Sequence, residues 1–297
     1  MKKTMKVYSG SSNQLLARLL AQKLNIALGK VELARFHNNE CRVFVADRPA
    51  TTVILVQSFS EPVDEHIIEF CLMADALHRT GAESIIAVIP WLGYSKQDKI
   101  FRPGEALSVK VIANILQTTP IKRFITLDLH NPAIAGFFDT PLFNISCDPI
   151  FRDYFKEKDL KGTVVVSPDT GAMKASSEFA NAFKLPIAHL NKQRDLRTGR
   201  VEVIDIDREV EGKQALILDD MIVTGATLIK AAAFLKKRGV ISVTVAATHH
   251  LYLLGVQEKL TKAVEAVVVT DSIMKPAGMV SGKLTILSVA DLIAQAI

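Results

Sequence analysis

The chain has 297 residues, a formal net charge of +5 and a pI near 9.0. Hydrophobic residues make up 49% of it, which is enough for two packed domains of about 150 residues each. Its positive residues are scattered and aromatic residues reach only 6%, whereas a nucleic-acid surface needs a basic stripe with stacking rings. Composition therefore argues against nucleic acid as a partner and favours small anionic substrates.

The cysteine spacing and the lengths of the apolar segments indicate where in the cell the protein is located. Cys41, Cys71 and Cys147 are far apart and form no CxxC pair, which indicates a reducing cytoplasm and no structural zinc. The two lysines near the amino terminus precede no apolar segment, so no secretory signal is expected. No run approaches the roughly 20 apolar residues of a membrane span. We expect a cytoplasmic protein without a membrane partner.

In chain order, the first predicted elements are a strand, a Ser-Gly-Ser-Ser turn and an amphipathic helix, between residues 6 and 28. The next stretch, ARFHNNECRVFV, predicts a hairpin with a polar tip between two apolar arms. Taken alone, Asn38, Asn39 and Glu40 are ordinary turn residues. An apolar strand, TTVILVQSF, and a helix from about Asp64 to His78 follow.

Two more strands of the first half end in polar groups. The strand SIIAVIP runs into a long polar loop, WLGYSKQDKIFRPGE. The strand RFITLDL is followed closely by Asp128 and His130, which share one face by the period of two. A lone histidine is usually structural, but at the carboxyl end of a strand and beside Asp128 we favour a metal or phosphate ligand.

A break at 147–149 separates two predicted domains, 1–148 and 149–297. The second begins with GTVVVSPDTGAMKAS, a strand, a turn with Asp169 and Gly171, and a helix start. This turn suits an anion, and a plain capped helix is the alternative. The later stretch NKQRDLRTGRVEV carries Lys192, Arg194, Arg197 and Arg200. It is either a solvated hairpin or, beside neighbouring sites, a mobile cationic arm.

The stretch ALILDDMIVTGAT, residues 215–227, combines the features of a sugar-phosphate site. Four apolar residues end in Asp219 and Asp220, and a turn with Gly225 then leads into a helix. Exposed backbone N–H groups, hydroxyls and the positive end of the helix suit a phosphate. Two carboxylates suit ribose hydroxyls or magnesium. They could instead only cap the helix, but a cap needs one carboxylate and no TGAT turn.

Both halves run strand, loop, helix, glycine, strand and loop, as in a duplicated unit. We expect an α/β fold of two similar domains, each with a mainly parallel sheet flanked by helices. The first loop, QSFSEPVDE, lacks the paired carboxylates and the TGAT turn. The first domain is therefore expected to have kept the scaffold and lost the sugar-phosphate site.

The stretch LILDDMIVTGAT resembles the phosphoribosyl diphosphate signature of type I phosphoribosyltransferases. Together with FHNNE, IPWLGYSKQD, TLDLH with GFFD, SPDTGAMKAS and NKQR, it resembles the ribose-phosphate pyrophosphokinase family nearly end to end. The segment RPGEALS is similar to archaeal-like members. The resemblance implies two phosphoribosyltransferase-like domains and a magnesium-dependent transfer of the diphosphoryl group of ATP to O1 of ribose 5-phosphate, with AMP as the other product.

The resemblance also implies roles for individual residues. Lys192 and Arg194 match the family's catalytic pair on a flexible arm, and His130 with Asp169 would bind the magnesium of Mg-ATP. ATP would contact a hairpin from a neighbouring subunit, which implies a homo-oligomer. The residues matched to ATP are Phe36, Asn38, Glu40, Lys96, Gln97 and Asp98. Those matched to ribose 5-phosphate are Asp219, Asp220, Thr224, Gly225, Ala226 and Thr227.

Two departures from the family pattern and two other functions stay open. Lys96 stands where the family usually has arginine, and Val223 replaces a polar residue before the TG pair. A lysine offers a point charge in place of a bidentate fork. The chain could instead be a phosphoribosyltransferase that uses phosphoribosyl diphosphate as donor, because the signature is shared, or a non-catalytic regulatory relative.

Overall fold

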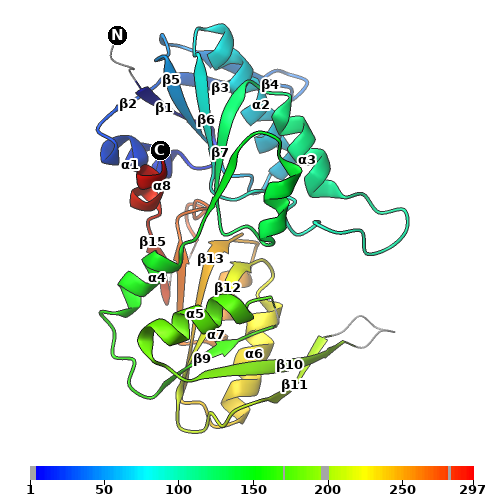
Figure 1. Ribbon diagram of the computed structural model, residues 1–297, viewed down its shortest axis with the longest axis vertical. Coiled ribbons are helices and arrows are strands. Elements are labelled where there is room, and N and C mark those ends of the chain that lie inside the picture. Colours follow the sequence, from blue (N-terminus) through cyan, green and yellow to red (C-terminus); the bar gives the residue numbers. More distant parts are fainter. Residues whose placement is uncertain (1–4, 170, 195–200, 280–281) are drawn as a thin grey trace. The chain divides into compact units, whose positions relative to one another are not determined.

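The computed structural model describes residues 5–169, 171–194, 201–279 and 282–297, apart from the side chains of 192–194 and 201–204 (Figure 1). The chain divides into two compact units. The first comprises 1–147 with 271–274 and 288–297, and the second comprises 148–270 with 275–287.

The first unit is built on a six-stranded parallel sheet in the order β2-β1-β5-β6-β7-β8. Its central strands are buried on both faces, which explains their unbroken apolar sequences. The strands are β1 Met5–Ser9, β2 Ala27–Leu28, β5 Thr52–Val56, β6 Ser84–Ile89, β7 Ile121–Leu127 and β8 Leu142–Ile145. The connecting helices are α1 Gln14–Lys23, α2 Val63–Arg79, α3 Ser108–Gln117 and the 3-10 helix η1 Pro132–Phe137.

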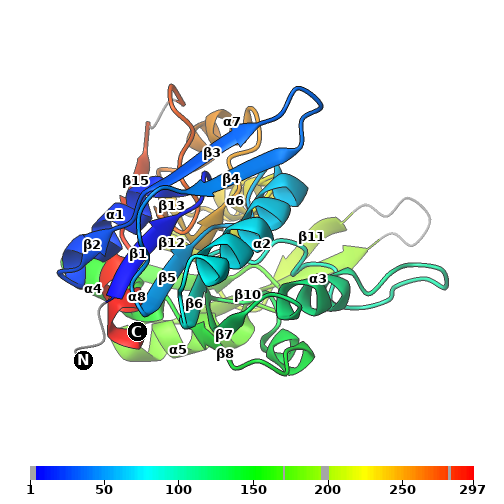
Figure 2. The same cartoon turned by 90° about the horizontal axis from the view of Figure 1, so that it is seen from above.

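A separate antiparallel hairpin, β3 Val31–Arg35 and β4 Cys41–Val45, is inserted between β2 and β5. Figure 2 shows it alongside α2, against which β4 packs. The predicted hairpin with its polar tip is therefore present. Its inner residues, among them Val43, join the core of the unit.

The second unit has a seven-stranded sheet in the order β11-β10-β9-β12-β13-β14-β15, parallel except for the β10–β11 pair. The strands are β9 Thr163–Ser167, β10 Ile187–Arg194, β11 Val201–Ile206, β12 Gln214–Ile222, β13 Ser242–His250, β14 Ala266–Thr270 and β15 Leu284–Leu287. The helices are α4 Asp148–Phe155, α5 Met173–Phe183, α6 Ala226–Lys237 and α7 Val256–Ala263.

The two sheets share one topology. The order β2-β1-β5-β6-β7-β8 becomes β10-β9-β12-β13-β14-β15, with β11 added at the edge. In each unit the second strand of the sheet is added on one side of the first strand, and the later strands are added on its other side. The strand order therefore reverses between β1 and β5, and between β9 and β12. Ligands of open α/β sheets collect beyond the carboxyl ends of the strands at such a switch point. The predicted α/β fold with two similar domains is confirmed.

The units differ from the predicted domains 1–148 and 149–297 at the carboxyl end of the chain. Segments 271–274 and 288–297 belong to the first unit, where helix α8 Ala290–Ala296 packs on α1. Ile293 of α8 is fully buried, and Lys23 pairs with Asp291 at 2.7 Å. In the second unit, α4 packs on α5, the counterpart of α1. Helix α4 follows the last strand of the first sheet but belongs to the second unit, and α8 follows the last strand of the second sheet but belongs to the first unit. A periodic apolar pattern does not predict which unit such a helix joins.

The part of the chain that the structure describes contains no helix with the length and apolar character that crossing a membrane requires. The three cysteines are free.

Replacing Ile293 by alanine should lower the free energy of unfolding by about 2–5 kcal/mol, because a buried isoleucine side chain leaves a cavity. Hydrogen exchange should rise in α1, which lies in the first unit, and not in α5. The exposed Gln295 lies on the same helix, so Gln295→Ala is the control. Loss of protection confined to the second unit would contradict the placement of α8.

Candidate functional site

The switch point of the second unit brings together the predicted acidic residues. Asp169 follows β9, and Asp219 and Asp220 lie near the end of the neighbouring strand β12. Burial raises the pKa of Asp219 well above its ordinary value, and the charges of Asp220 and Asp169 raise it further. The three carboxylates therefore lie near enough to interact, and the like charges of Asp220 and Asp169 disfavour the ionised form of Asp219.

Strand β12 continues past the two carboxylates, whereas the sequence pattern predicted that it ends at them. It runs to Ile222, and Met221 and Ile222 are buried and pair with His249 and His250 of β13. The half-buried carboxylates are therefore held by a paired strand. Asp219 Oδ1 accepts a hydrogen bond of 2.9 Å from the Asp220 N–H, which fixes its orientation.

The turn that follows β12 ends at Gly225, the residue before helix α6. Gly225 has φ +66°, a left-handed conformation that costs other residues about 1–2 kcal/mol. The side chains of Thr224 and Thr227 are exposed on either side of it, and Thr224 Oγ1 accepts from the Ala226 N–H at 3.4 Å. First-turn N–H groups lack acceptors within their own helix. The turn therefore offers hydroxyls, N–H donors and the positive end of α6 to an anion.

Asp169 also caps its own turn. Its Oδ1 accepts from the N–H groups of Gly171 and Ala172, both at 3.1 Å, just before α5. These bonds close the turn and do not cap the helix, because the N-cap residue of α5 is Ala172 and no side chain caps it; the capped-helix alternative is therefore not supported. The two bonds hold Asp169 at the switch point, and a carboxylate can accept more hydrogen bonds than these two.

The predicted cationic arm lies on the hairpin of β10 and β11. The backbone of Lys192 pairs with Val203 and that of Arg194 with Val201. The side chains of Lys192 and Arg194 lie outside the described part of the structure. Arg197, Arg200 and Thr170 lie outside the described residues altogether.

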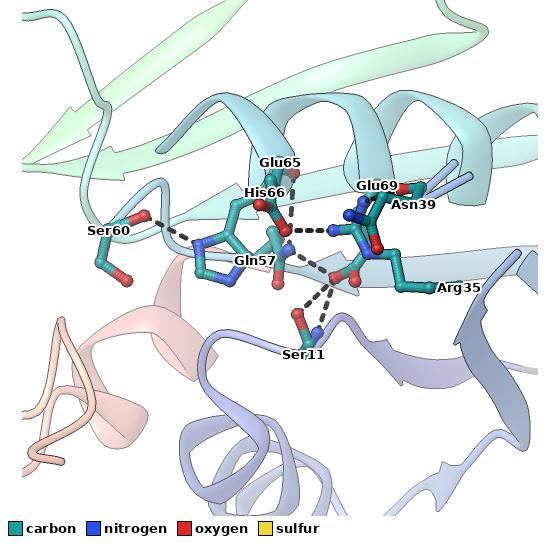
Figure 3. A network of polar contacts seen from close by, with 8 residues as sticks. All are labelled: Ser11, Arg35, Asn39, Gln57, Ser60, Glu65, His66 and Glu69. Carbon is teal, nitrogen blue, oxygen red and sulfur yellow. Dashed lines mark hydrogen bonds and ion pairs between the residues drawn. The ribbon is translucent and has the colours of Figure 1, made fainter. Parts of the chain in front are cut away.

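The predicted nucleotide residues of the hairpin tip are solvent-exposed in the first unit. Phe36 is 52% exposed, and Asn38 and Glu40 are exposed as well. Arg35 holds the tip in shape, since it donates to the Asn39 carbonyl at 2.9 Å and pairs with Glu65 of α2 (Figure 3). The tip therefore presents its side chains outward and not into the core of its own unit.

The loop after β6 carries Lys96, Gln97 and Asp98. Gln97 Oε1 accepts from Ser108 Oγ at 2.6 Å, which ties the loop to α3. Asn131 donates from Nδ2 to Asp98 Oδ2 at 2.6 Å. This bond joins the loop to the segment that follows β7. The exposed His130 is the neighbour of Asn131 in that segment. Asp98 and His130 are thus brought to one region of the first unit.

An open depression of about 440 Å³ lies next to this loop. Tyr94 takes part in its wall and donates from its hydroxyl to Asp64 Oδ1 at 2.5 Å. Sequence reasoning missed Asn131 and Tyr94. The left-handed φ of +66° at Tyr94 could not be foreseen from its residue type. The depression is lined by Pro62, Val63, Asp64, Glu65, Tyr94 and Gln97.

The switch point of the first unit is filled by the chain's own polar groups (Figure 3). The carboxylate of Glu69 accepts from Ser11 N at 2.7 Å, from Ser11 Oγ at 2.8 Å and from Gln57 Nε2 at 2.7 Å. Gln57 Oε1 accepts in turn from the N–H and hydroxyl of Ser12. Glu69 and Gln57 are buried. Buried polar groups of the chain itself, the Glu69 carboxylate among them, thus occupy the switch point of the first unit.

The predicted metal ligands fall in different units, His130 in the first and Asp169 in the second. Among the residues that the structure covers, no group of three or more histidine, cysteine, aspartate or glutamate side chains is arranged to hold a metal ion.

Sequence reasoning missed one histidine near the second site. His250, the last residue of β13, is fully buried and neutral, because burial lowers its pKa to about 4. It lies beside Ile222, the residue that precedes the turn. The sequence shows His250 only as part of the stretch HHLY. The pairing register of β12 and β13 is what brings it next to the turn.

Replacing Gly225 by alanine should cost more stability than replacing Gly212. Both glycines have a left-handed φ, +66° and +68°, so each substitution carries the same backbone cost of about 1–2 kcal/mol. At Gly225 a Cβ would also lie 3.3 Å from side-chain atoms of Val256 and Leu260, whereas Gly212 has open space. Chemical denaturation of the two variants measures the difference, and equal losses would contradict the tight contact with α7.

Replacing Asp219 by asparagine should stabilise the protein by about 1 kcal/mol at neutral pH. The pKa of Asp219 is raised above its ordinary 3.8. The folded chain therefore holds this proton more tightly than the unfolded chain, and stability falls as pH rises through the raised pKa. The asparagine keeps the oxygen that accepts from Asp220.

The gain should shrink at acid pH, where the wild-type carboxyl is protonated. Asp159→Asn is the matched control, since Asp159 is exposed and also accepts a backbone N–H, from Lys161 at 2.9 Å. Unfolding curves at several pH values that show a constant or reversed difference for Asp219→Asn would contradict the raised pKa of Asp219.

Comparisons with known proteins agree with this geometry. The family model of the N-terminal domain of ribose phosphate pyrophosphokinase matches residues 5–119, and that of the phosphoribosyl transferase domain matches residues 135–275. A ribose-phosphate pyrophosphokinase of Corynebacterium ammoniagenes is 40% identical over 99% of this chain and 93% of its own length. That of Fusobacterium nucleatum is 39% identical, over 99% and 94%.

A solved structure shares the fold over nearly the whole chain. The crystal structure of phosphoribosylpyrophosphate synthetase from Mycobacterium smegmatis superimposes with a TM-score of 0.91 at 29% identity, and covers 99% of this chain and 97% of that one. Both family models and relatives of this identity and coverage lead to one conclusion: the chain belongs to the ribose-phosphate pyrophosphokinase family.

Proposed function

We propose that the chain transfers the diphosphoryl group of ATP to O1 of ribose 5-phosphate, which gives 5-phosphoribosyl 1-diphosphate and AMP. One observation carries the proposal. Of two equivalent switch points, the first is filled by Glu69 and Gln57, and the second presents carboxylates beside an anion-binding turn. A pentose phosphate needs both features at once. The family relationship, which extends over both units, favours this reaction over a transferase that uses the diphosphate as donor.

Ribose 5-phosphate is placed at the second switch point. The 5-phosphate lies at the turn of Thr224, Gly225, Ala226 and Thr227, where two exposed hydroxyls and the start of α6 supply donors and positive potential. Asp219 and Asp220 accept hydrogen bonds from the ribose hydroxyls. Val223 adds no polar group, so binding rests on the backbone and the threonines.

ATP is placed with Lys96, Gln97 and Asp98 of the first unit and with Phe36, Asn38 and Glu40 of a hairpin tip. The outward exposure of that tip supports its insertion into a neighbouring copy, where Phe36 stacks on the base. The ATP site is then shared across subunits, and the chain functions as a homo-oligomer. The proposal also includes a cytoplasmic location, which agrees with the three free cysteines. It includes no nucleic-acid partner.

Magnesium fits the donors near the second switch point. Carboxylate oxygens are the ligands that Mg²⁺ prefers. Burial and, to a lesser extent, the charges of Asp220 and Asp169 disfavour the ionised form of Asp219, and a divalent cation would offset that cost. Asp169 and His130 would hold the Mg²⁺ of Mg-ATP. When bound, the ion supplies charge neutralisation to the phosphates. The carboxylates of the chain orient the sugar, and the turn fixes its phosphate.

Lys192 and Arg194 are proposed as the catalytic residues. Phosphoryl transfer asks little covalent help of a protein and much charge stabilisation, so cations near the β-phosphorus are the expected device. The proposal is supported by strand pairing: both residues belong to β10, which pairs with β9, and Asp169 follows β9 in the chain.

The product assay tests the function. Incubation with Mg-ATP and ribose 5-phosphate should give AMP and 5-phosphoribosyl 1-diphosphate in equal amounts. ADP in place of AMP would refute the proposal, as would release of pyrophosphate from phosphoribosyl diphosphate and a nucleobase without the first reaction.

Replacing Lys192 or Arg194 by alanine should lower kcat by about 10²–10³-fold with a small change in the KM for ribose 5-phosphate, by analogy with the loss of one oxyanion-hole donor. Lys161→Ala, a change at an exposed lysine of the same unit, is the control. Steady-state kinetics that show weaker binding at unchanged kcat would remove both residues from the catalytic role.

A further inference from the structure

Helix α7 forms the floor beneath the sugar-phosphate turn. The space beside Gly225 is closed by Val256 Cγ1 and Leu260 Cγ, each 3.3 Å from where a Cβ would lie. Both side chains are buried and lie on one face of α7. A shift of α7 would therefore shift the backbone of the turn, whose N–H groups are the proposed phosphate donors.

A buried polar residue anchors the first turn of α7. Gln257 is only 2% exposed, so both ends of its amide need partners. Its Oε1 lies 3.2 Å from His250 Nε2, and its Nε2 donates to the Gly282 carbonyl at 3.4 Å. The side chain at the start of α7 is thus tied to the end of strand β13.

The contacts of His250 fix its tautomer and its ring. Its Nδ1 accepts from the Tyr252 N–H at 2.8 Å, so the proton resides on Nε2 and is donated to Gln257. The ring stacks on Tyr252 with centroids 4.2 Å apart. Tyr252 has a left-handed φ of +54°, a strained conformation that these two contacts hold in place.

The backbone beside His250 reaches the other end of the same turn. His250 pairs with Ile222, and the next residue, Leu251, donates its N–H to the Ile222 carbonyl at 2.9 Å. Ile222 is the last residue of β12 before the turn. The segment of His250 and Leu251 therefore contacts the beginning of the turn directly. It acts on the end of the turn through Gln257 and α7.

We propose that His250 is a positioning residue for substrate: through its hydrogen bond to Gln257 it sets the backbone of residues 224–227 in the geometry that binds the phosphate of ribose 5-phosphate. The inference rests on the proposed function, because it takes the turn as the site of that phosphate. His250 does not contact the substrate. Its loss should therefore weaken ribose 5-phosphate binding and leave ATP binding unchanged.

Two near-isosteric variants separate the two bonds of the ring. Asparagine keeps an acceptor near the Nδ1 position and loses the donor to Gln257, whereas glutamine keeps a donor near Nε2 and loses the acceptor for Tyr252. His250→Asn should raise the KM and Kd for ribose 5-phosphate about tenfold, the equivalent of one lost hydrogen bond, at a kcat within about twofold of wild type. His250→Gln should restore the affinity but lower the Tm.

Gln257→Leu should reproduce the effect of His250→Asn, and the double variant should be no weaker than either single one, because both remove the same link. The control is His78→Asn at the end of α2, where Nδ1 contacts the Ala82 carbonyl at 3.3 Å in the first unit. Calorimetric binding of ribose 5-phosphate is measured beside steady-state kinetics.

Wild-type affinity in His250→Asn would overturn the inference, and so would equal losses for both substrates or additive effects in the double variant. If wild type binds ribose 5-phosphate but forms no phosphoribosyl diphosphate, the proposed reaction fails and the calorimetric comparison still decides the role of His250. If wild type does not bind ribose 5-phosphate, both fall.

Discussion

The burial of the Asp219 carboxylate, next to the charges of Asp220 and Asp169, is the constraint on which the second unit depends. Burial first and the neighbouring like charges second make its ionised form unfavourable, and its raised pKa reflects that cost. The fold bears it because β12 is paired beyond the carboxylates and because Asp169 is bound by two backbone N–H groups. Strain of this kind is typical of functional sites, where a ligand relieves it.

The first unit shows how the same scaffold behaves without that constraint. Its corresponding switch point holds one carboxylate, that of Glu69, which accepts hydrogen bonds from Ser11 and Gln57. A buried polar network whose members are hydrogen-bonded to one another rigidifies the structure around it. The two switch points therefore differ: the first carries a closed network of the chain's own polar groups, and the second carries three aspartates beside a glycine turn.

Much of this arrangement follows from the sequence, and the remainder has identifiable physical causes. Unbroken apolar runs predicted the buried parallel strands, and the motif at 215–227 predicted a strand with an acid pair followed by a glycine turn and a helix, because these parts are contiguous. The bonds between Glu69 and Ser11 could not be predicted, because the two residues are 58 positions apart and only the fold brings them together. His250 and Gln257 are seven residues apart in sequence, and only their burial shows that they form a pair. The apolar pattern of a helix shows which of its faces is buried, but not which unit it packs against, as α8 illustrates.

The placement of α8 has a consequence for synthesis. Helix α1 ends at Lys23 and α8 begins at Ala290, so more than 260 residues must be added to the chain before the partner of α1 is made. At about 5–20 residues per second, this takes about 13–53 s. During that interval the face of α1 that α8 covers has no partner from α8, so this part of the first unit is completed only after the second sheet has been made.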